Sequence, residues 1–96
     1  MPTEQSITIS ANSSYTVTGN STQTMGIWEV ADSGKSGSKL IANIGFNGSA
    51  STYPGIGIIS SIGGIERYVS ITKDNGWSFE INNLTNGNLT VKIRHI

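Results

Sequence analysis

Three consecutive residues, Glu66, Arg67 and Tyr68, place a carboxylate, a guanidinium and a phenol side by side in the chain. Together they offer hydrogen-bond donors and acceptors within one short stretch. In a strand that begins at Ile65, Arg67 would share a face with apolar residues such as Val69, where a buried charge is costly unless it is paired. The sequence therefore predicts either a bulge or edge position from which Arg67 reaches solvent, or a pocket or subunit interface that contains it.

Two tyrosines are expected at the surface. Tyr68 falls on the polar face of the same strand, with Glu66 and Ser70, and Tyr53 lies in a loop of small and polar residues. Exposed aromatic rings stack on the apolar faces of sugars, while polar side chains beside them bind the hydroxyls. Single surface tyrosines are also common without any role. Tyr53 and Tyr68 are therefore the predicted stacking residues of a ligand site, with Arg67 and Glu66 as hydrogen-bonding residues.

Nothing in the sequence marks a catalytic centre. The single histidine, His95, is expected to continue the apolar face of the last strand instead of acting with a serine and a carboxylate. Glu66 and Glu80 could approach each other on neighbouring strands, as glycoside hydrolysis requires, but we expect both to be solvated surface charges. The loop at Asp74 lacks the ligand density of a calcium site. We therefore expect no enzymatic activity, no metal and no cofactor.

Charge and cysteine content argue against several classes of protein. Six basic and six acidic residues give a net charge of zero. The basic residues are scattered, so binding to nucleic acid through phosphate contacts is not expected. No apolar run approaches transmembrane length, and we expect no membrane insertion. The chain has no cysteine, which excludes disulfides and thiolate metal sites. No signal peptide is visible at the N-terminus.

Alternation of apolar and polar residues, the period of a half-buried strand, runs through most of the chain, and helical periodicity is missing. Turn signals recur at the spacing of an all-β sandwich or barrel, which predicts about eight short strands. Their cores read SITIS, YTVT, TMGIWEV, KLIANIGF, IGIISSI, IERYVSIT, WSFEI and LTVKIRHI. The predicted architecture is one domain, residues 1–96, folded as an antiparallel β-sandwich of jelly-roll or immunoglobulin-like type.

Dipeptides that contain glycine predict where the strands turn back. Asn-Gly suits tight hairpins because it tolerates positive φ, and it occurs at Asn47-Gly48, Asn75-Gly76 and Asn86-Gly87. The last two, together with Gly63-Gly64, are expected to close hairpins. The four strands between Ile56 and Ile96 should then form a local meander. The stretch from Asp32 to Lys39 is expected to be a flexible surface loop.

The apolar faces predict the core and an interface. Trp77 and Tyr15 alternate with apolar residues and are expected in the core, whereas Trp28 could belong to the core, an interface or a site. Between Ile56 and Ile62, one face carries Ile56, Ile58 and Ile62 and is expected to meet the core, and the other carries Gly57, Ile59 and Ser61. Strands that are apolar on both faces suggest, in so small a chain, that a second subunit covers one of them. We expect a homo-oligomer, and a trimer is one size that it could take.

The run GSKLIANIGF…YPGIGIIS…GG, within Gly37 to Gly64, resembles the central strands of bacterial trimeric lectin domains with a TNF-like jelly roll. In that family an aromatic-Pro-Gly-Ile stretch also begins a strand after a polar loop. The low charge, the many Ser, Thr, Asn and Gly residues and the short Ile-rich strands are similar to the receptor-binding heads of phage tail fibres. Both resemblances imply recognition of a glycan or cell-surface receptor by a β-rich oligomer, outside a cell or on a virion. Neither supplies binding residues for this chain.

The leading hypothesis is therefore a non-enzymatic module for carbohydrate or cell-surface recognition, either lectin-like or a tail-fibre head. The alternative is a purely structural decoration or adaptor subunit of a virion, a fibre or a surface assembly. In that alternative the polar surface serves solubility, and the second apolar face serves assembly.

Overall fold

The structure, a computed structural model, describes residues 3–19, 21–35, 37–45, 55–74 and 77–96. Its elements are β1 (Thr3–Ile9), β2 (Ser14–Val17), α1 (Ser21–Thr24), β3 (Gly26–Asp32), β4 (Lys39–Gly45), β5 (Gly55–Ile62), the 3-10 turn η1 (Ile65–Arg67), β6 (Val69–Lys73), β7 (Phe79–Asn83) and β8 (Leu89–His95). Every neighbouring pair of strands is antiparallel. The predicted all-β class and the predicted number of strands are confirmed.

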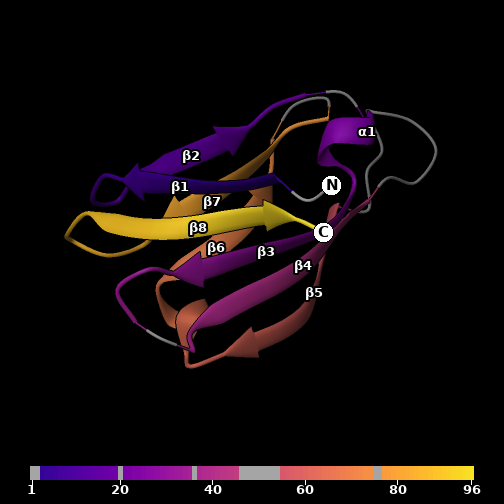
Figure 1. Cartoon of the computed structure of the whole chain (residues 1–96). Helices are drawn as coiled ribbons and strands as arrows, with labels where there is room; N and C mark the ends of the chain where they lie inside the picture. Colours follow the sequence, from indigo (N-terminus) through magenta and orange to yellow (C-terminus); the bar gives the residue numbers. More distant parts are fainter. Residues whose placement is uncertain (1–2, 20, 36, 46–54, 75–76) are drawn as a thin grey trace.

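The strands form two sheets that pack face to face (Figure 1). The larger sheet has five strands in the order β1-β8-β3-β4-β5, and the smaller has three in the order β2-β7-β6. Alternation decides which side chains point between the sheets. In β8, for example, Val91 and Ile93 are buried while Lys92 between them is exposed. This arrangement is the antiparallel sandwich that the two-residue period predicts.

Each of the first two strands pairs with one of the last two. β1 lies beside β8 in one sheet, and β2 lies beside β7 in the other. Pairing of strands so distant in sequence is typical of jelly rolls, whereas in the immunoglobulin order the first two strands share a sheet. β3, β4 and β5 follow one another as sequential neighbours. Of the two sandwich types considered, the strand order is therefore nearer to the jelly roll.

Two predicted hairpins are wrong. The strands that flank Gly63-Gly64, β5 and β6, belong to different sheets, and so do β7 and β8, which flank Asn86-Gly87. A dipeptide that tolerates positive φ can turn the chain into the opposite layer as well as back onto its own strand. The predicted meander from Ile56 to Ile96 is wrong for the same reason. The third hairpin is confirmed by the pairing of β6 with β7, although Asn75-Gly76 and Asn47-Gly48 lie outside the described residues.

Asn83, at the end of β7, holds the connection that crosses from β7 in the smaller sheet to β8 in the larger one. Its buried side chain donates from Nδ2 to the carbonyl oxygens of Ile9 at 2.9 Å, Ser10 at 3.1 Å and Gly87 at 2.8 Å. Its Oδ1 accepts from the backbone N–H of Thr85 at 2.9 Å and from the Thr85 hydroxyl at 2.7 Å. A buried amide that makes these bonds ties the β7–β8 connection to the turn between β1 and β2.

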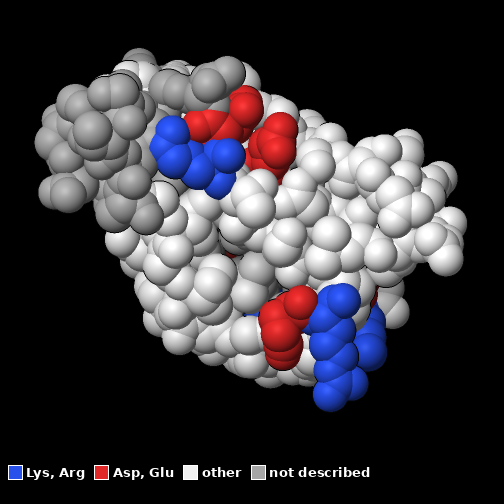
Figure 2. Space-filling model, turned by 180° about the vertical axis from the view of Figure 1, so that it is seen from behind, with Lys and Arg blue, Asp and Glu red and all other residues white. Residues whose placement is uncertain are grey.

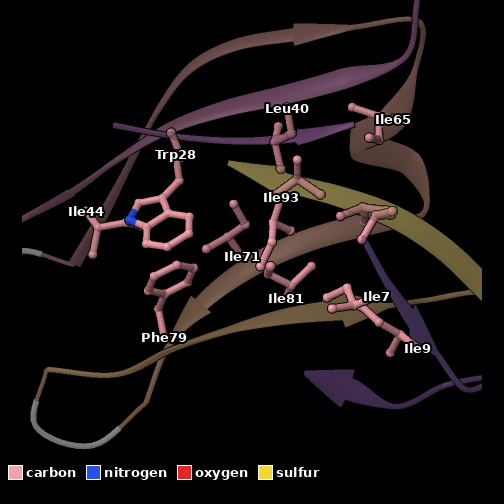
Figure 3. Close-up of a cluster of buried hydrophobic side chains, with 14 residues drawn as sticks. Ile7, Ile9, Trp28, Leu40, Ile44, Ile65, Ile71, Phe79, Ile81 and Ile93 are labelled. Atoms are coloured by element: carbon pink, nitrogen blue, oxygen red, sulfur yellow. The ribbon is translucent and has the colours of Figure 1, made fainter. Parts of the chain in front are cut away.

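Trp28 lies in the core, which settles the three alternatives left open for it (Figure 3). Its ring meets Phe79 edge to face at 5.2 Å and stacks on the His95 imidazole at 4.4 Å. Aromatic pairs of this kind add about 0.5–1.5 kcal/mol to the burial of apolar area. His95 thus continues the inward face of β8, as predicted. Trp77 and Tyr15, both predicted in the core, are only half-buried.

The predicted faces of β5 are partly wrong, because a bulge interrupts the alternation. Ala42 pairs with Ile58, but the preceding residue, Ile41, pairs with Ser60, so Ile59 is the extra residue of the bulge. One inserted residue reverses the faces of everything that follows it. Ser61 therefore lies opposite the buried Leu40, while Ile62 lies opposite Lys39 and turns outward, away from the core.

Candidate functional site

Three segments meet at the end of the sandwich that is opposite to both ends of the chain (Figure 1). They are the β3–β4 loop, the end of β5, and η1. The contact between the first two is very close: the Ser38 hydroxyl donates to the carbonyl of Gly63 at 3.2 Å. Gly63 and Gly64 both have positive φ, of 72° and 73°, which permits the turn from β5 into η1. A Cβ at Gly63 would collide with the side chain and the Cα of Ser38.

The stretch that was expected to begin a strand at Ile65 is a 3-10 turn instead. The N–H of Arg67 donates to the carbonyl of Gly64 at 3.1 Å, and that of Tyr68 donates to the carbonyl of Ile65 at 3.0 Å. About three residues per turn bury Ile65 and leave Glu66 and Arg67 exposed. The expectation that Arg67 shares the apolar face is therefore wrong. Its side chain is exposed, so its charge carries no cost of burial in the core. Its side chain lies over the turn at Gly64.

Tyr68 is not the freely exposed residue that the strand pattern predicts. It is half-buried and packs against the core. Its hydroxyl donates to Oδ2 of Asp32 at 2.6 Å, and the ammonium of Lys35 lies 5.7 Å from the centre of its ring. Partial burial raises the pKa of the Tyr68 hydroxyl above its ordinary value, as do the hydrogen bond to Asp32 and the negative charge of that carboxylate; a hydrogen bond with Ser38 acts in the opposite direction.

Asp32 makes two hydrogen bonds at the start of the stretch from Asp32 to Lys39, which the sequence predicts to be a flexible surface loop. One carboxylate oxygen accepts from Tyr68, and the other accepts from the N–H of Gly34 at 2.9 Å. The second bond is a local turn of the kind that Asp favours. Asp32 and Lys35 were not among the predicted site residues. The Asp-Ser-Gly sequence signals this turn, but nothing local signals the contact with Tyr68, which lies 36 residues further along the chain.

Glu66 stands at the rim of a groove between the two sheets. The hydroxyl of Ser61 donates to its carboxylate at 2.9 Å. The groove has a volume of about 170 Å³ and is lined by Leu40, Ile58, Glu66, Val69, Ser70 and Ile71. It opens where β5 extends beyond the smaller sheet, since β5 and β6 are the edge strands on that side.

The structure thus brings together three of the four predicted site residues. We call Asp32, Lys35, Glu66, Arg67 and Tyr68 the loop-end cluster. Tyr53, the fourth predicted residue, lies outside the described residues. Seen from the side of the smaller sheet, acidic and basic residues gather at two places with uncharged surface between them (Figure 2). The loop-end cluster itself contains two acidic and two basic residues, so it favours polar ligands of mixed or no charge over strongly charged ones.

The chemistry available here is hydrogen bonding and ion pairing. His95 is remote from the cluster, because its ring stacks in the core and Nε2 lies 2.7 Å from the carbonyl oxygen of Met25. Glu80 is on β7, where it lies between its cross-strand partners Thr16 of β2 and Thr72 of β6, and it is not beside Glu66. Among the residues that the structure describes, no three His, Cys, Asp or Glu side chains gather as metal ligands would. In the same part of the chain, no helix is long and apolar enough to cross a membrane.

Comparison of the chain with protein-family models, with curated proteins and with solved structures gives no match.

Proposed function

We propose that this domain is a non-enzymatic recognition module that binds a carbohydrate or another polar group of a cell surface at the loop-end cluster. The observation that carries this proposal is the hydrogen bond from Tyr68 to Asp32. It joins η1 to the β3–β4 loop, and so holds the exposed side chains of Glu66 and Arg67 on a rigid support. Loops fixed on a rigid scaffold are the usual place for binding residues in β-sandwiches.

The composition of the cluster suits a sugar. A pyranose is uncharged and amphipathic, so it is bound by donors and acceptors placed beside a partly exposed aromatic ring. Arg67 supplies donors and Glu66 supplies acceptors, while Tyr68 contributes the accessible part of its ring. Lys35 lies over that ring, and a stacked ligand would displace its ammonium toward solvent. Tyr53 remains a second stacking residue in this proposal, on the basis of the sequence alone.

A glycan array probed with the full chain, followed by titration of any saccharide that binds, tests the proposal. Arg67→Ala and Glu66→Gln remove hydrogen bonds to charged groups, each worth about 1.5–3 kcal/mol, so each should weaken binding by about 10- to 100-fold. Both residues are exposed, and neither change should unfold the protein. Lys92→Ala, an exposed change on β8, is the matched control. Absence of binding across a broad array, or binding unchanged by both substitutions, would refute the proposal.

A second function, a structural subunit of a virion, fibre or surface assembly, is favoured by a different observation. β5 is an edge strand that exposes three isoleucines, Ile58, Ile59 and Ile62. Exposed apolar residues grouped in this way mark an association surface. The two functions predict different results: a purely structural subunit assembles but binds no saccharide, whereas a recognition module loses its ligand when Arg67 is changed.

A further inference from the structure

β5 exposes more apolar surface than the other described strands. Ile58 is 53 % exposed, Ile59 is 58 % exposed and Ile62 is 47 % exposed. The bulge is one cause, because it turns Ile62 outward. The other cause is the difference in sheet width, which leaves Ile58 over the open groove and not under a facing strand. Exposed isoleucines on one strand favour contact with another protein surface.

The four edge strands of the sandwich differ in how they are protected. Proteins guard edges with charged residues, proline, bulges or very short strands. β1 carries the exposed Glu4, β6 ends at the exposed Lys73, and β2 has only four residues. β5 has eight residues and no charge, and its one protective feature is the bulge at Ile59. Of the described edges, β5 is therefore the most open to pairing with another strand.

The outer face of the larger sheet offers no comparable surface at β3 and β4. Glu29 occupies the middle of that face, where it pairs with Lys39 at 3.3 Å and with Arg94 at 3.6 Å. An apolar partner seated there would have to desolvate these ion pairs. Among the described residues, the apolar second face that the sequence suggests for several strands is therefore found at β5 and not in the middle of β3 and β4.

The charges at the two ends of β5 select a second copy of the chain as the partner. Glu66 lies at the end of the groove where β5 finishes, bonded to Ser61. Lys73 lines a smaller hollow at the other end, beside Gly55 and Ile56, with its ammonium 2.8 Å from the carbonyl oxygen of Asp74. If two copies place β5 against β5 in opposite directions, Glu66 of each copy approaches Lys73 of the other. The β5 edge, an uncharged strand with an acidic residue at one end and a basic residue at the other, is thus complementary to the same edge of a second, antiparallel copy.

We propose that two copies of this chain associate through β5, antiparallel about a two-fold axis, so that the two five-stranded sheets join edge to edge. A two-fold interface of this kind closes with two copies, which makes a dimer and not a trimer the expected assembly. A single strand edge is small compared with a standard interface of about 1,600 Å², so the dimer should form only at roughly micromolar concentrations or above. The inference goes beyond saccharide binding and does not depend on it.

Sedimentation equilibrium of the full chain, from about 1 to 200 μM, tests the dimer because the interface size predicts dissociation within this range. Ile59→Lys places a charge on the edge and should weaken association at least about tenfold. Ser6→Lys places the same charge on the β1 edge and should leave the association unchanged. The near-ultraviolet circular dichroism of the aromatic residues, compared between Ile59→Lys and the wild type, shows whether the variant is folded. A monomer at every concentration, a trimer, or a dimer that Ile59→Lys leaves intact would each overturn the proposal.

Charge reversal gives a second readout that does not rely on one variant's folding. Glu66→Lys and Lys73→Glu should each weaken the dimer, because each brings like charges together at both ends of the interface. The double variant Glu66→Lys/Lys73→Glu restores opposite charges and should recover most of the association. Failure of the double variant to recover it would contradict the antiparallel arrangement. Saccharide binding by monomeric Ile59→Lys is measured separately, so the two proposals can fail independently.

Discussion

The hydrogen bond between Tyr68 and Asp32 joins two parts of the chain that would otherwise be independent surface segments. One partner is charged, and such bonds contribute about 1.5–3 kcal/mol when they are protected from water. Tyr68 is half-buried, which provides part of that protection. The same bond therefore stabilises the fold and positions Glu66 and Arg67, so its loss should be measurable in two ways.

Tyr68→Phe removes this hydroxyl and keeps the ring. We expect the free energy of unfolding to fall by about 1–3 kcal/mol, because the Asp32 carboxylate loses a donor. Tyr15→Phe is the matched control, since the Tyr15 hydroxyl only accepts a long bond of 3.3 Å from Gln5 at the surface. Its effect should stay within about 0.5 kcal/mol. Equal effects of the two substitutions in urea unfolding would argue against a structural role for the bond to Asp32.

The raised pKa of Tyr68 predicts a dependence of stability on alkaline pH. In the unfolded chain the hydroxyl ionises near its ordinary pKa of about 10, below its pKa in the folded protein. Between these two values the unfolded state binds fewer protons, so the stability conferred by the protonated tyrosine is complete below pH 10 and is lost as pH rises through the folded pKa. Unfolding free energies measured from about pH 9 upward should fall more steeply for the wild type than for Tyr68→Phe. Parallel curves would contradict this expectation.

Asn83 should be far more sensitive to substitution than its neighbours in sequence. Asn83→Ala removes the side-chain donor to the Ile9 carbonyl and the acceptor of the Thr85 N–H, whereas the Ser10 carbonyl keeps the N–H of Ser13 and the Gly87 carbonyl keeps the Thr85 hydroxyl. Since an unsatisfied buried polar group costs about 1–3 kcal/mol and two groups lose their partner, the total loss should be at least about 2 kcal/mol. Asn88→Ala changes the same residue type at an exposed position and should cost about 0.5 kcal/mol or less. Chemical denaturation of both variants makes the comparison, and similar losses would refute the role given to Asn83.

At the scale of the element, the connection from β5 to η1 decides where the loop-end cluster stands. Gly63 and Gly64 turn the chain out of the larger sheet, and the 3-10 turn then carries it to β6 in the smaller one. The close contact of Gly63 with Ser38 also sets the distance between η1 and the β3–β4 loop. A change in this turn should therefore affect the cluster without touching any of its side chains.

Gly63→Ala tests that dependence. The new Cβ meets the Ser38 side chain and lies 2.9 Å from the Ser38 Cα, and the positive φ adds strain of about 1 kcal/mol or more. We expect a loss of stability of about 2–4 kcal/mol and weaker binding of the saccharide proposed for the cluster. Gly57→Ala, in β5, has open space around the new Cβ and should not destabilise the protein. Thermal unfolding distinguishes the two, and a neutral Gly63→Ala would show that the contact with Ser38 is not required.

The strands could be predicted from the sequence because their signal is local. Alternation identifies which side of Val91 or Ile93 is buried without any knowledge of the neighbouring strand. The connections that cross from one sheet to the other could not be predicted. Gly63-Gly64 and Asn86-Gly87 indicate only that the chain turns, not which sheet it enters next. The expectation for Arg67 is wrong for a related reason. The sequence predicts a strand that begins at Ile65, but the chain forms a 3-10 turn there.

The candidate site was predictable to a similar extent. Glu66, Arg67 and Tyr68 could be selected because they are adjacent in sequence and carry complementary chemistry. Asp32 and Lys35 could not, because their place in the cluster depends on the β3–β4 loop folding onto η1. The bulge at Ile59 was equally hidden, since the sequence of β5 continues to alternate acceptably in either register.

At the scale of the whole molecule, the nested topology makes the fold depend on contacts between its two ends. β1 can pair with β8 only after nearly the full chain is available, and β2 with β7 likewise. Such pairing requires the closure of long loops before any contact is gained. The core around Trp28 includes residues of both sheets, so it cannot be completed by either sheet alone.

This topology predicts slow, concerted refolding. All-β sandwiches with distant strand pairs fold in roughly milliseconds to seconds, and we expect the same here. Trp28 reports on the process once Trp77 is replaced by Phe, because its fluorescence then depends on stacking against His95 and contact with Phe79. Stopped-flow dilution from urea should show one main phase in this range, at a concentration low enough to keep the chain monomeric. Refolding that is complete within microseconds would mean that local contacts, not the β1–β8 pair, limit the rate.

The register of β8 has a mechanical consequence. Thr3 lies opposite His95 at one end of an antiparallel ladder, so tension applied between these two residues would open its seven residue pairs one after another, like a zip. Tension between His95 and the Asp32 end of β3 runs differently. It pulls β3 and β8 lengthwise past each other and loads all their hydrogen bonds at once, in shear. A domain tethered through its last strand and gripped at the loop-end cluster would therefore resist a steady pull far better than one stretched between its own two ends.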